Sequence, residues 1–183
     1  MVLLKSNRGE PGSPAPDFSL TGVDGKVYSL SAFSGKDILV VIFMCNHCPY
    51  VKAVIGRLVK LQSDYAAKGV QFVGISPNDT EAYPDDSFDN MKLFHAEYGM
   101  NFPYLIDETQ DIAKKYDAVC TPDIYVYDKS RTLKYRGRLD DNWQDESAVK
   151  SQDLKTALNA LLTGKEIETD QIPSMGCSIK WKK

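Results

Sequence analysis

Two cysteines separated by two residues, Cys45 and Cys48, form the pattern with the clearest chemical meaning in this sequence. Two intervening residues let one thiol reach the other, so the pair can close into a disulfide and reopen. His47 lies between them and would favour a thiolate when it is protonated. The sequence therefore predicts dithiol–disulfide chemistry at these positions.

The same spacing occurs in half of a zinc site, but zinc needs a second pair of ligands. Cys120 and Cys177 stand alone in the sequence, and His95 is the only other histidine. A c-type haem site would need a histidine at the position of Pro49. We therefore expect no cofactor and no resident metal. One alternative stays open, in which the cysteine pair holds a soft ion such as Cu(I) with His47 or Cys120.

A buried strand and a helix are expected to hold the two cysteines in place. Residues 38–43 (ILVVIF) are continuously apolar and mostly β-branched, which is typical of a strand buried on both faces. Pro49 suits the first turn of a helix, apolar residues recur at helical spacing over 51–61, and Gly69 offers a C-terminal cap. A helix N-terminus carries unpaired N–H groups and the positive end of the helix dipole, which stabilise a thiolate.

The rest of the chain alternates strands and helices, which favours an α/β fold with a central mixed sheet flanked by helices. Strands are expected over 17–20, 26–30, 70–76, 104–106, 124–127 and 133–136, and helices over 88–98, 109–116 and 147–162. Asp24-Gly25 favours an N-terminal β-hairpin. We expect one domain over residues 1–164, including this hairpin and an N-terminal arm, and a C-terminal tail over 165–183 that packs on it.

Composition excludes several classes of function. The chain has 183 residues and a formal net charge of −3, from 22 basic and 25 acidic residues. Nucleic-acid binding through a basic surface needs clustered Lys and Arg, so we expect no nucleic-acid partner. No apolar run approaches the roughly 20 residues that span a bilayer, so no membrane is expected. The lack of a secretory signal, together with only four cysteines, makes a cytoplasmic location the expectation.

Several motifs together resemble the redoxin branch of the thioredoxin superfamily, which includes alkyl-hydroperoxide-reductase-like and cytochrome-maturation-type thioredoxins. The resemblance covers about residues 11–162. It is carried by Pro16-Asp17-Phe18, FMCNHCPY over 43–50, Thr121-Pro122 and Arg136-Gly137-Arg138-Leu139-Asp140. The chain is most similar to peroxiredoxin-like bacterial proteins that end in GCSIKW, here residues 176–181.

This resemblance implies a thioredoxin-like fold in which Pro122, preceded by Thr121, is cis and faces the cysteine pair. In thioredoxins the first cysteine attacks, which would be Cys45, and the second resolves. In peroxiredoxins the reacting cysteine would be Cys48. Val41 and Cys45 stand where that family has its proline and threonine, and its peroxide-binding arginine would fall near Pro122. The resemblance therefore favours disulfide exchange over a fast peroxidase.

The remaining candidates have two interpretations each. Cys120 could accept a disulfide from the pair or fill the core, and Cys177 could fold back as a resolving thiol or simply lie in a packed tail. The acidic segment 79–89 could bind a cation, but it lacks the spacing of a calcium loop, so a solvated loop is the expectation. Asp140 or Asp141 could accept a proton near the buried thiol, although surface charge is the simpler expectation.

We therefore expect an oxidoreductase whose partners are a disulfide of a protein or a small thiol and a cellular dithiol reductant. The alternatives are a thiol peroxidase that reduces hydroperoxides through a sulfenic acid, and the Cu(I)-type binding module. The sequence leaves the oligomeric state open.

Overall fold

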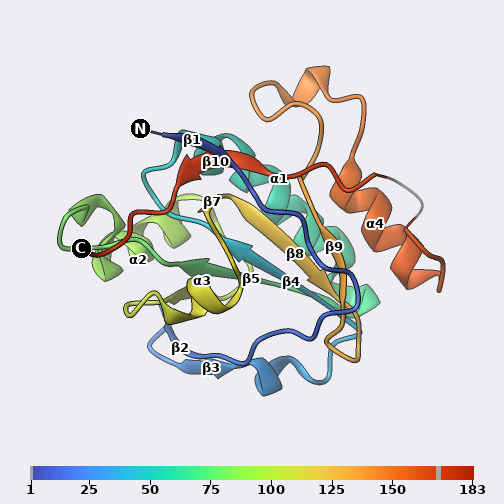
Figure 1. Cartoon of the computed structure of the whole chain (residues 1–183), viewed down its shortest axis with the longest axis horizontal. Helices are drawn as coiled ribbons and strands as arrows, with labels where there is room; N and C mark the ends of the chain where they lie inside the picture. Colours follow the sequence, from blue (N-terminus) through green and yellow to red (C-terminus); the bar gives the residue numbers. More distant parts are fainter. Residues whose placement is uncertain (1, 168–169) are drawn as a thin grey trace.

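The computed structural model describes residues 2–167 and 170–183 (Figure 1). Met1 and residues 168–169, the latter within the tail expected over 165–183, lie outside the described residues. A seven-stranded mixed sheet, in the order β3-β2-β6-β5-β4-β8-β9, forms the centre. Its strands are β2 (Ser19–Gly22), β3 (Val27–Ser29), β4 (Ile38–Phe43), β5 (Val70–Ser76), β6 (Tyr104–Ile106), β8 (Asp123–Tyr127) and β9 (Leu133–Arg136).

Strand β4 is central, parallel to β5 on one side and antiparallel to β8 on the other. Its side chains alternate between two apolar cores, with Ile42 on one face and Phe43 on the other. The first core also takes buried side chains from α1 (Pro49–Tyr65), α2 (Phe88–Glu97) and α4 (Asp153–Leu162). The second takes them from α3 (Asp111–Lys115) and the N-terminal arm. The continuous apolar run arises because both faces of the strand are covered.

The expected α/β fold and its mixed sheet are confirmed, and β4 and β5 have the expected bounds. β2 lies two residues later than the expected 17–20, and the last helix differs most, because α4 begins at Asp153 and not at Ser147. Residues 146–148 form a 3-10 turn, and Val149 is extended. The backbone N–H groups of Lys150 and Ser151 donate to Asp141 at 2.9 and 3.0 Å. Because these two amides donate to Asp141, they are not available for hydrogen bonds within a helix, and the helix begins later in the sequence.

A second, three-stranded sheet was not expected from the sequence. It pairs β1 (Leu3–Lys5) with β10 (Met175–Ser178), and β10 with β7 (Cys120–Thr121), all antiparallel. In Figure 1 the C-terminal strand therefore lies beside the N-terminal one. The C-terminal tail is thus built into the fold as the central strand of this sheet.

Gly176 lets β10 approach β7 closely. A Cβ atom at this position would lie 1.9 Å from the carbonyl oxygen of Thr121 and 3.0 Å from the nitrogen of Pro122. Both atoms belong to the backbone, so neither can move aside as a flexible side chain would. Only glycine fits here.

No helix within the described ranges is both long and apolar enough to cross a membrane.

Substituting Gly176→Ala should displace β10 and destabilise the protein by about 1–3 kcal/mol, because backbone atoms must shift to admit the methyl group. Gly56→Ala is the matched control. It adds the same methyl group within α1, where nothing outside the helix's own backbone and the adjacent residues lies within 4 Å, and should stabilise by about 0.5–1 kcal/mol. Urea unfolding of both variants measures the two changes, and equal stability of Gly176→Ala and the wild type would contradict the packing described here.

Candidate redox site

Cys45 and Cys48 lie at the junction between β4 and α1. Cys48 is the N-cap residue of α1, and Pro49 occupies the first helical position. Both sulfur-bearing side chains are fully buried. The buried strand fixes the chain before the pair and the helix fixes it afterwards, so the two thiols are held by rigid elements on both sides.

The Thr121–Pro122 peptide bond is cis, and this segment faces both cysteines. The hydroxyl of Thr121 lies 3.4 Å from the sulfur of Cys45. The thiol of Cys48 donates to the carbonyl oxygen of Thr121 at 3.1 Å. The structure therefore brings together four of the residues that the sequence singled out.

Cys177 joins this group from the C-terminal tail. Cys177 pairs with Thr121 in the β10–β7 register, and its sulfur lies 2.9 Å from that of Cys48. We refer to Cys45, Cys48 and Cys177 as the thiol cluster. No disulfide joins these cysteines within the described part of the chain.

The three cysteines of the thiol cluster differ in pKa. A hydrogen bond from Cys45, assisted by Cys177 and by the backbone N–H of Val51, outweighs burial and lowers the pKa of Cys48 to about 5. Hydrogen bonding to Cys48 and burial raise the pKa of Cys45 well above its usual range. Burial and the bond to Cys48 raise the pKa of Cys177 to about 12. A carbonyl oxygen can only accept a hydrogen bond, so Cys48 contacts Thr121 in this way when its thiol is protonated. When Cys48 is a thiolate, it accepts hydrogen bonds from the thiols of Cys45 and Cys177.

His47 is anchored by a buried carboxylate. Its Nδ1 lies 2.6 Å from Asp86 Oδ2, and its ring stacks on Tyr83 with centroids 5.8 Å apart. The hydrogen bond to Asp86 outweighs burial and raises the pKa of His47. Burial disfavours ionisation of Asp86, but hydrogen bonds from His47 and Asn78 prevail and lower its pKa. Both shifts therefore favour the charged forms of the two side chains.

The solvated loop expected over residues 79–89 is wrong at Asp86, which is fully buried. Each of its oxygens accepts two N–H groups. The backbone amides of Asn46 and His47 donate to Oδ1, and the His47 ring and the Asn78 side chain contact Oδ2. One signal could have pointed to this residue. It follows β5, which neighbours β4, so the loops after these two strands meet.

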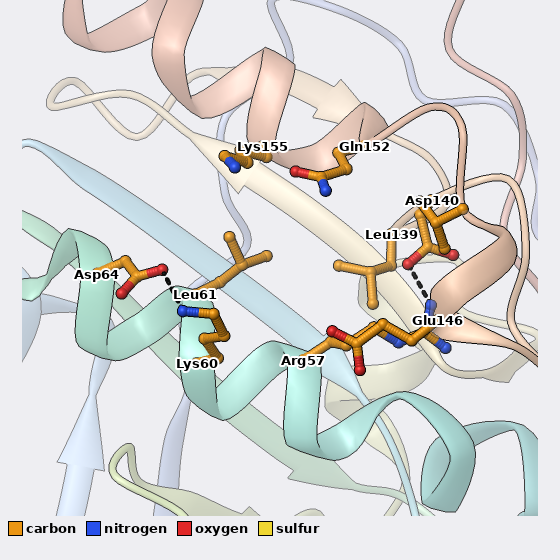
Figure 2. A pocket seen from close by; sticks show the side chains of 10 residues that line it. Arg57, Lys60, Leu61, Asp64, Leu139, Asp140, Glu146, Gln152 and Lys155 are labelled. Carbon is orange, nitrogen blue, oxygen red and sulfur yellow. Dashed lines mark hydrogen bonds and ion pairs between the residues drawn. The ribbon is translucent and has the colours of Figure 1, made fainter.

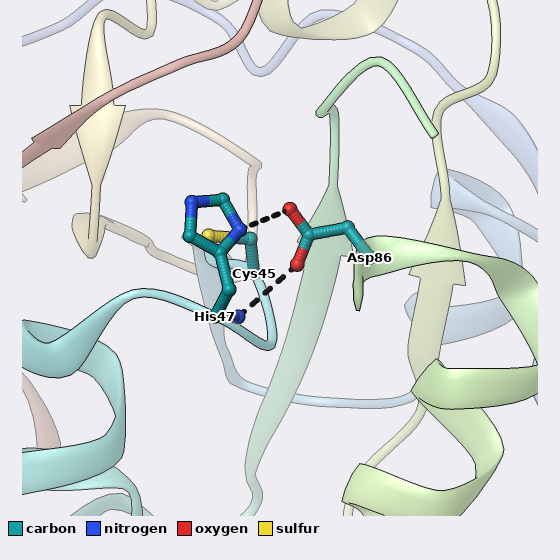
Figure 3. A group of neighbouring side chains, drawn as sticks. All are labelled: Cys45, His47 and Asp86. Carbon is teal, nitrogen blue, oxygen red and sulfur yellow. Dashed lines mark hydrogen bonds and ion pairs between the residues drawn. The ribbon is translucent and has the colours of Figure 1, made fainter. Parts of the chain in front are cut away.

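Cys45, His47 and Asp86 each present one possible metal ligand, and these atoms lie within 4.8 Å of one another (Figure 3). The four N–H contacts already occupy the acceptor positions of the carboxylate. A soft ion such as Cu(I) also prefers sulfur over a carboxylate oxygen. Hydrogen bonding thus accounts for the arrangement of these three residues.

The other candidates take part in other contacts. Cys120 lies 3.8 Å from the carbonyl oxygen of Pro122, and burial raises its pKa. Asp140 pairs with Arg57 of α1 at 2.5 Å, and Asp141 accepts the loop amides described above. The second histidine, His95, contacts the carbonyl oxygen of Phe102 at 3.3 Å. Asp140 and Asp141 therefore fix the segment that precedes α4.

Two pockets lie along α1. One, of about 250 Å³, borders the site and is lined by Tyr50, Pro122, Trp143 and Met175 among others. Figure 2 shows the other, of about 200 Å³, between α1 and the segment around the start of α4. In the pocket of Figure 2, Lys60 pairs with Asp64 and Arg57 with Asp140, and no cysteine is among the described lining residues. The first pocket is therefore the one relevant to the redox site.

Thiolate absorbance near 240 nm should reveal one ionisation with a midpoint near pH 5, and Cys48→Ser should abolish it. Cys45→Ala should raise this midpoint, because it removes the main hydrogen-bond donor. Cys45→Ser retains a donor and should shift the midpoint less. If Cys45→Ala leaves the midpoint unchanged, the thiolate does not depend on Cys45.

The His47–Asp86 pair should make stability depend on pH. The pKa of His47 is raised, so its contribution is complete below about pH 6.5 and is lost as pH rises through the folded pKa. The pKa of Asp86 is lowered, so its contribution is lost only as pH falls below its usual value of 3.8. His47→Gln should therefore cost about 1–3 kcal/mol near pH 6 and less as pH rises. Urea unfolding across this range measures the difference, and a constant difference would mean that the charge on His47 contributes nothing.

Comparisons with known proteins agree with this geometry. A structure titled as an uncharacterized conserved protein from Geobacillus kaustophilus superimposes with a TM-score of 0.94 at 48% identity, covering 100% of this chain and 97% of that one. The thiol-disulfide oxidoreductase ResA of Bacillus thuringiensis is 27% identical over 125 residues, 68% of each chain. The chloroplastic peroxiredoxin Q of Triticum aestivum is 26% identical over 131 residues, 68% of this chain and 57% of its own.

The match to a family model covers most of the folded core. The AhpC/TSA model aligns with residues 11–136, which include β4, both cysteines of the pair and the cis-proline segment. The fold is thioredoxin-like, as the motifs implied. The chain belongs to the AhpC/TSA family.

Proposed function

We propose that this protein is a thiol–disulfide oxidoreductase that works through Cys45 and Cys48. The observation that carries the proposal is the pair itself, placed at a strand–helix junction against a cis-proline segment, with the pKa of Cys48 near 5. A thiolate is the reactive species in disulfide exchange, and Cys48 supplies one at neutral pH. The similarity to ResA supports the same chemistry.

The reaction begins when the Cys48 thiolate attacks one sulfur of a disulfide. A mixed disulfide forms, and the other sulfur leaves as a thiolate. A second thiol of the protein then attacks Cys48, releases the remaining half of the substrate, and leaves an internal disulfide that ends between Cys45 and Cys48. An external dithiol returns the pair to the reduced state.

The electrostatics favour Cys48 as the attacking residue. Thioredoxins would place this role on Cys45, but here the Cys45 thiol is the hydrogen-bond donor and its pKa is raised. We infer that His47 assists, because its charge and that of the Cys48 thiolate attract each other. Thr121 and Pro122 hold the backbone against which both sulfurs rest.

The substrates follow from this chemistry only as a class. We infer a disulfide of a protein or of a small thiol as oxidant, a cellular dithiol as reductant, and a cytoplasmic setting where such dithiols are abundant.

Hydroperoxide reduction is a second candidate, because the Cys48 thiolate and the similarity to peroxiredoxin Q both favour it. The sequence has Pro122 where the resemblance would place the peroxide-binding arginine. Arg136 cannot substitute, because it is buried in an ion pair with Asp123 at 2.9 Å and also donates to the carbonyl oxygen of Asp117. Exchange therefore remains the better-supported reaction.

Reduced protein should react with a disulfide faster than an ordinary thiol does, and Cys48→Ser should lower the rate at least about a hundredfold. Cys45→Ser should retain the first attack and fail to form the Cys45–Cys48 disulfide. Cys120→Ser is the matched control, since it replaces another buried thiol, and should keep the wild-type rate. The measurement compares the rate of insulin disulfide reduction with the rate at which the reduced protein consumes one equivalent of hydrogen peroxide. A faster reaction with peroxide than with disulfides would reverse the preference.

A further inference from the structure

The C-terminal strand β10 lies directly against the proposed active site. β10 pairs with β7, and its register places Cys177 opposite Thr121, the residue before the cis-proline. Gly176 allows this approach, because any side chain there would overlap the Thr121 carbonyl. The position of Cys177 is therefore fixed by backbone pairing on one side and by close packing on the other.

The sulfur of Cys177 is in direct contact with that of Cys48. The separation is 2.9 Å, whereas a disulfide bond measures about 2.0 Å, so a small movement would close it. The thiol of Cys45 also hydrogen-bonds to Cys48, and its sulfur lies 3.4 Å from the hydroxyl of Thr121. Cys177 and Cys48 are thus two hydrogen-bonded cysteine side chains placed as the reduced form of a disulfide pair.

Further contacts hold the tail on both sides of Cys177. Before it, β10 pairs with β1 over residues 175–177. After it, Ile179 is buried in the second core, and the backbone of Lys180 bonds to Asn78 and Asp79. Asn78 also donates to Asp86, which anchors the loop of the cysteine pair. The tail and that loop therefore share one hydrogen-bonded support.

We propose that Cys177 resolves the mixed disulfide on Cys48, so that a Cys48–Cys177 disulfide forms first and Cys45 then converts it into Cys45–Cys48. This rests on the proposed function. The substrate thiolate released by the first attack takes the proton of Cys177. The Cys177 thiolate then attacks the Cys48 sulfur and expels the second substrate thiolate, which takes a proton from solvent. Cys45 next attacks Cys48, and Cys177 leaves and is protonated by the proton that Cys45 gives up.

Burial gives this order a structural reason. Cys48 is fully buried, and its sulfur lies against Cys177 of β10 and Thr121 of β7, so movement of β10 off β7 is the step that would expose it to a substrate disulfide. Re-pairing of β10 with β7 then returns Cys177 to the Cys48 sulfur. The movement that restores the β10–β7 pairing therefore also brings Cys177 into position to resolve the mixed disulfide.

The test is to mix reduced protein with one equivalent of oxidised glutathione, quench with acid at successive times, alkylate, and map disulfides by mass spectrometry. In the wild type, Cys48–Cys177 should appear before Cys45–Cys48. In Cys45→Ala it should be the final product. In Cys177→Ala the glutathione adduct on Cys48 should persist at least about tenfold longer, because a thiol held in contact is lost. Cys120→Ala is the control and should resolve at the wild-type rate, with circular dichroism and thermal unfolding to verify that each variant folds.

Oxidation with diamide separates this proposal from the proposed function, because diamide needs no substrate site. If Cys48–Cys177 forms with diamide while disulfides react no faster than with an ordinary thiol, the proposed exchange function fails and the Cys48–Cys177 couple stands. If only Cys45–Cys48 forms at every time and with both oxidants, while Cys177 stays alkylated, the role of Cys177 is overturned and the exchange function stands.

Discussion

The conformation of the redox site depends on the carboxylate of Asp86, which accepts four N–H groups inside the protein. Two of these donors are consecutive backbone amides of the loop between β4 and α1. A buried carboxylate without partners would be very unfavourable, so the loop is held in the one conformation that supplies all four donors. Because Asn78 is among them, the loops after two neighbouring strands are tied to the same group.

The thiol cluster shows how a charge can be kept where water cannot reach it. The Cys48 side chain is fully buried, and burial alone would raise its pKa. The donors that reverse this effect are mainly other thiols, and each of them is also a potential disulfide partner. Protonation and oxidation are therefore linked, since oxidising a donor removes the proton that stabilises the thiolate.

Much of this molecule could be predicted from local patterns. The runs over 38–43 and 70–76 specify β4 and β5, because burial on both faces leaves a continuous apolar signature. The cysteine pair was recognisable from its place between such a strand and an amphipathic helix. In each of these cases the residues that determine the structure are neighbours in the sequence.

The features that were not predicted depend on partners far away in the chain. β1 and β10 are only three and four residues long. They form strands because β10 pairs with β1 on one side and with β7 on the other. Asp86 resembles its exposed neighbours in sequence, and its burial follows from the loop after β4. The start of α4 is set by Asp141, whose carboxylate lies outside the helical segment.

Gly176 also determines the alignment of the last strand. A slip of β10 by one residue would press the Cβ of Met175 or Cys177 against the Thr121 carbonyl and turn alternate side chains to the opposite face. Because only a residue without a side chain fits against the Thr121 carbonyl, β10 pairs with β7 in a single register. This holds whatever the length of the segment before β10. Insertions or deletions before Met175 would change the length of the connection without changing which sulfur meets Cys48.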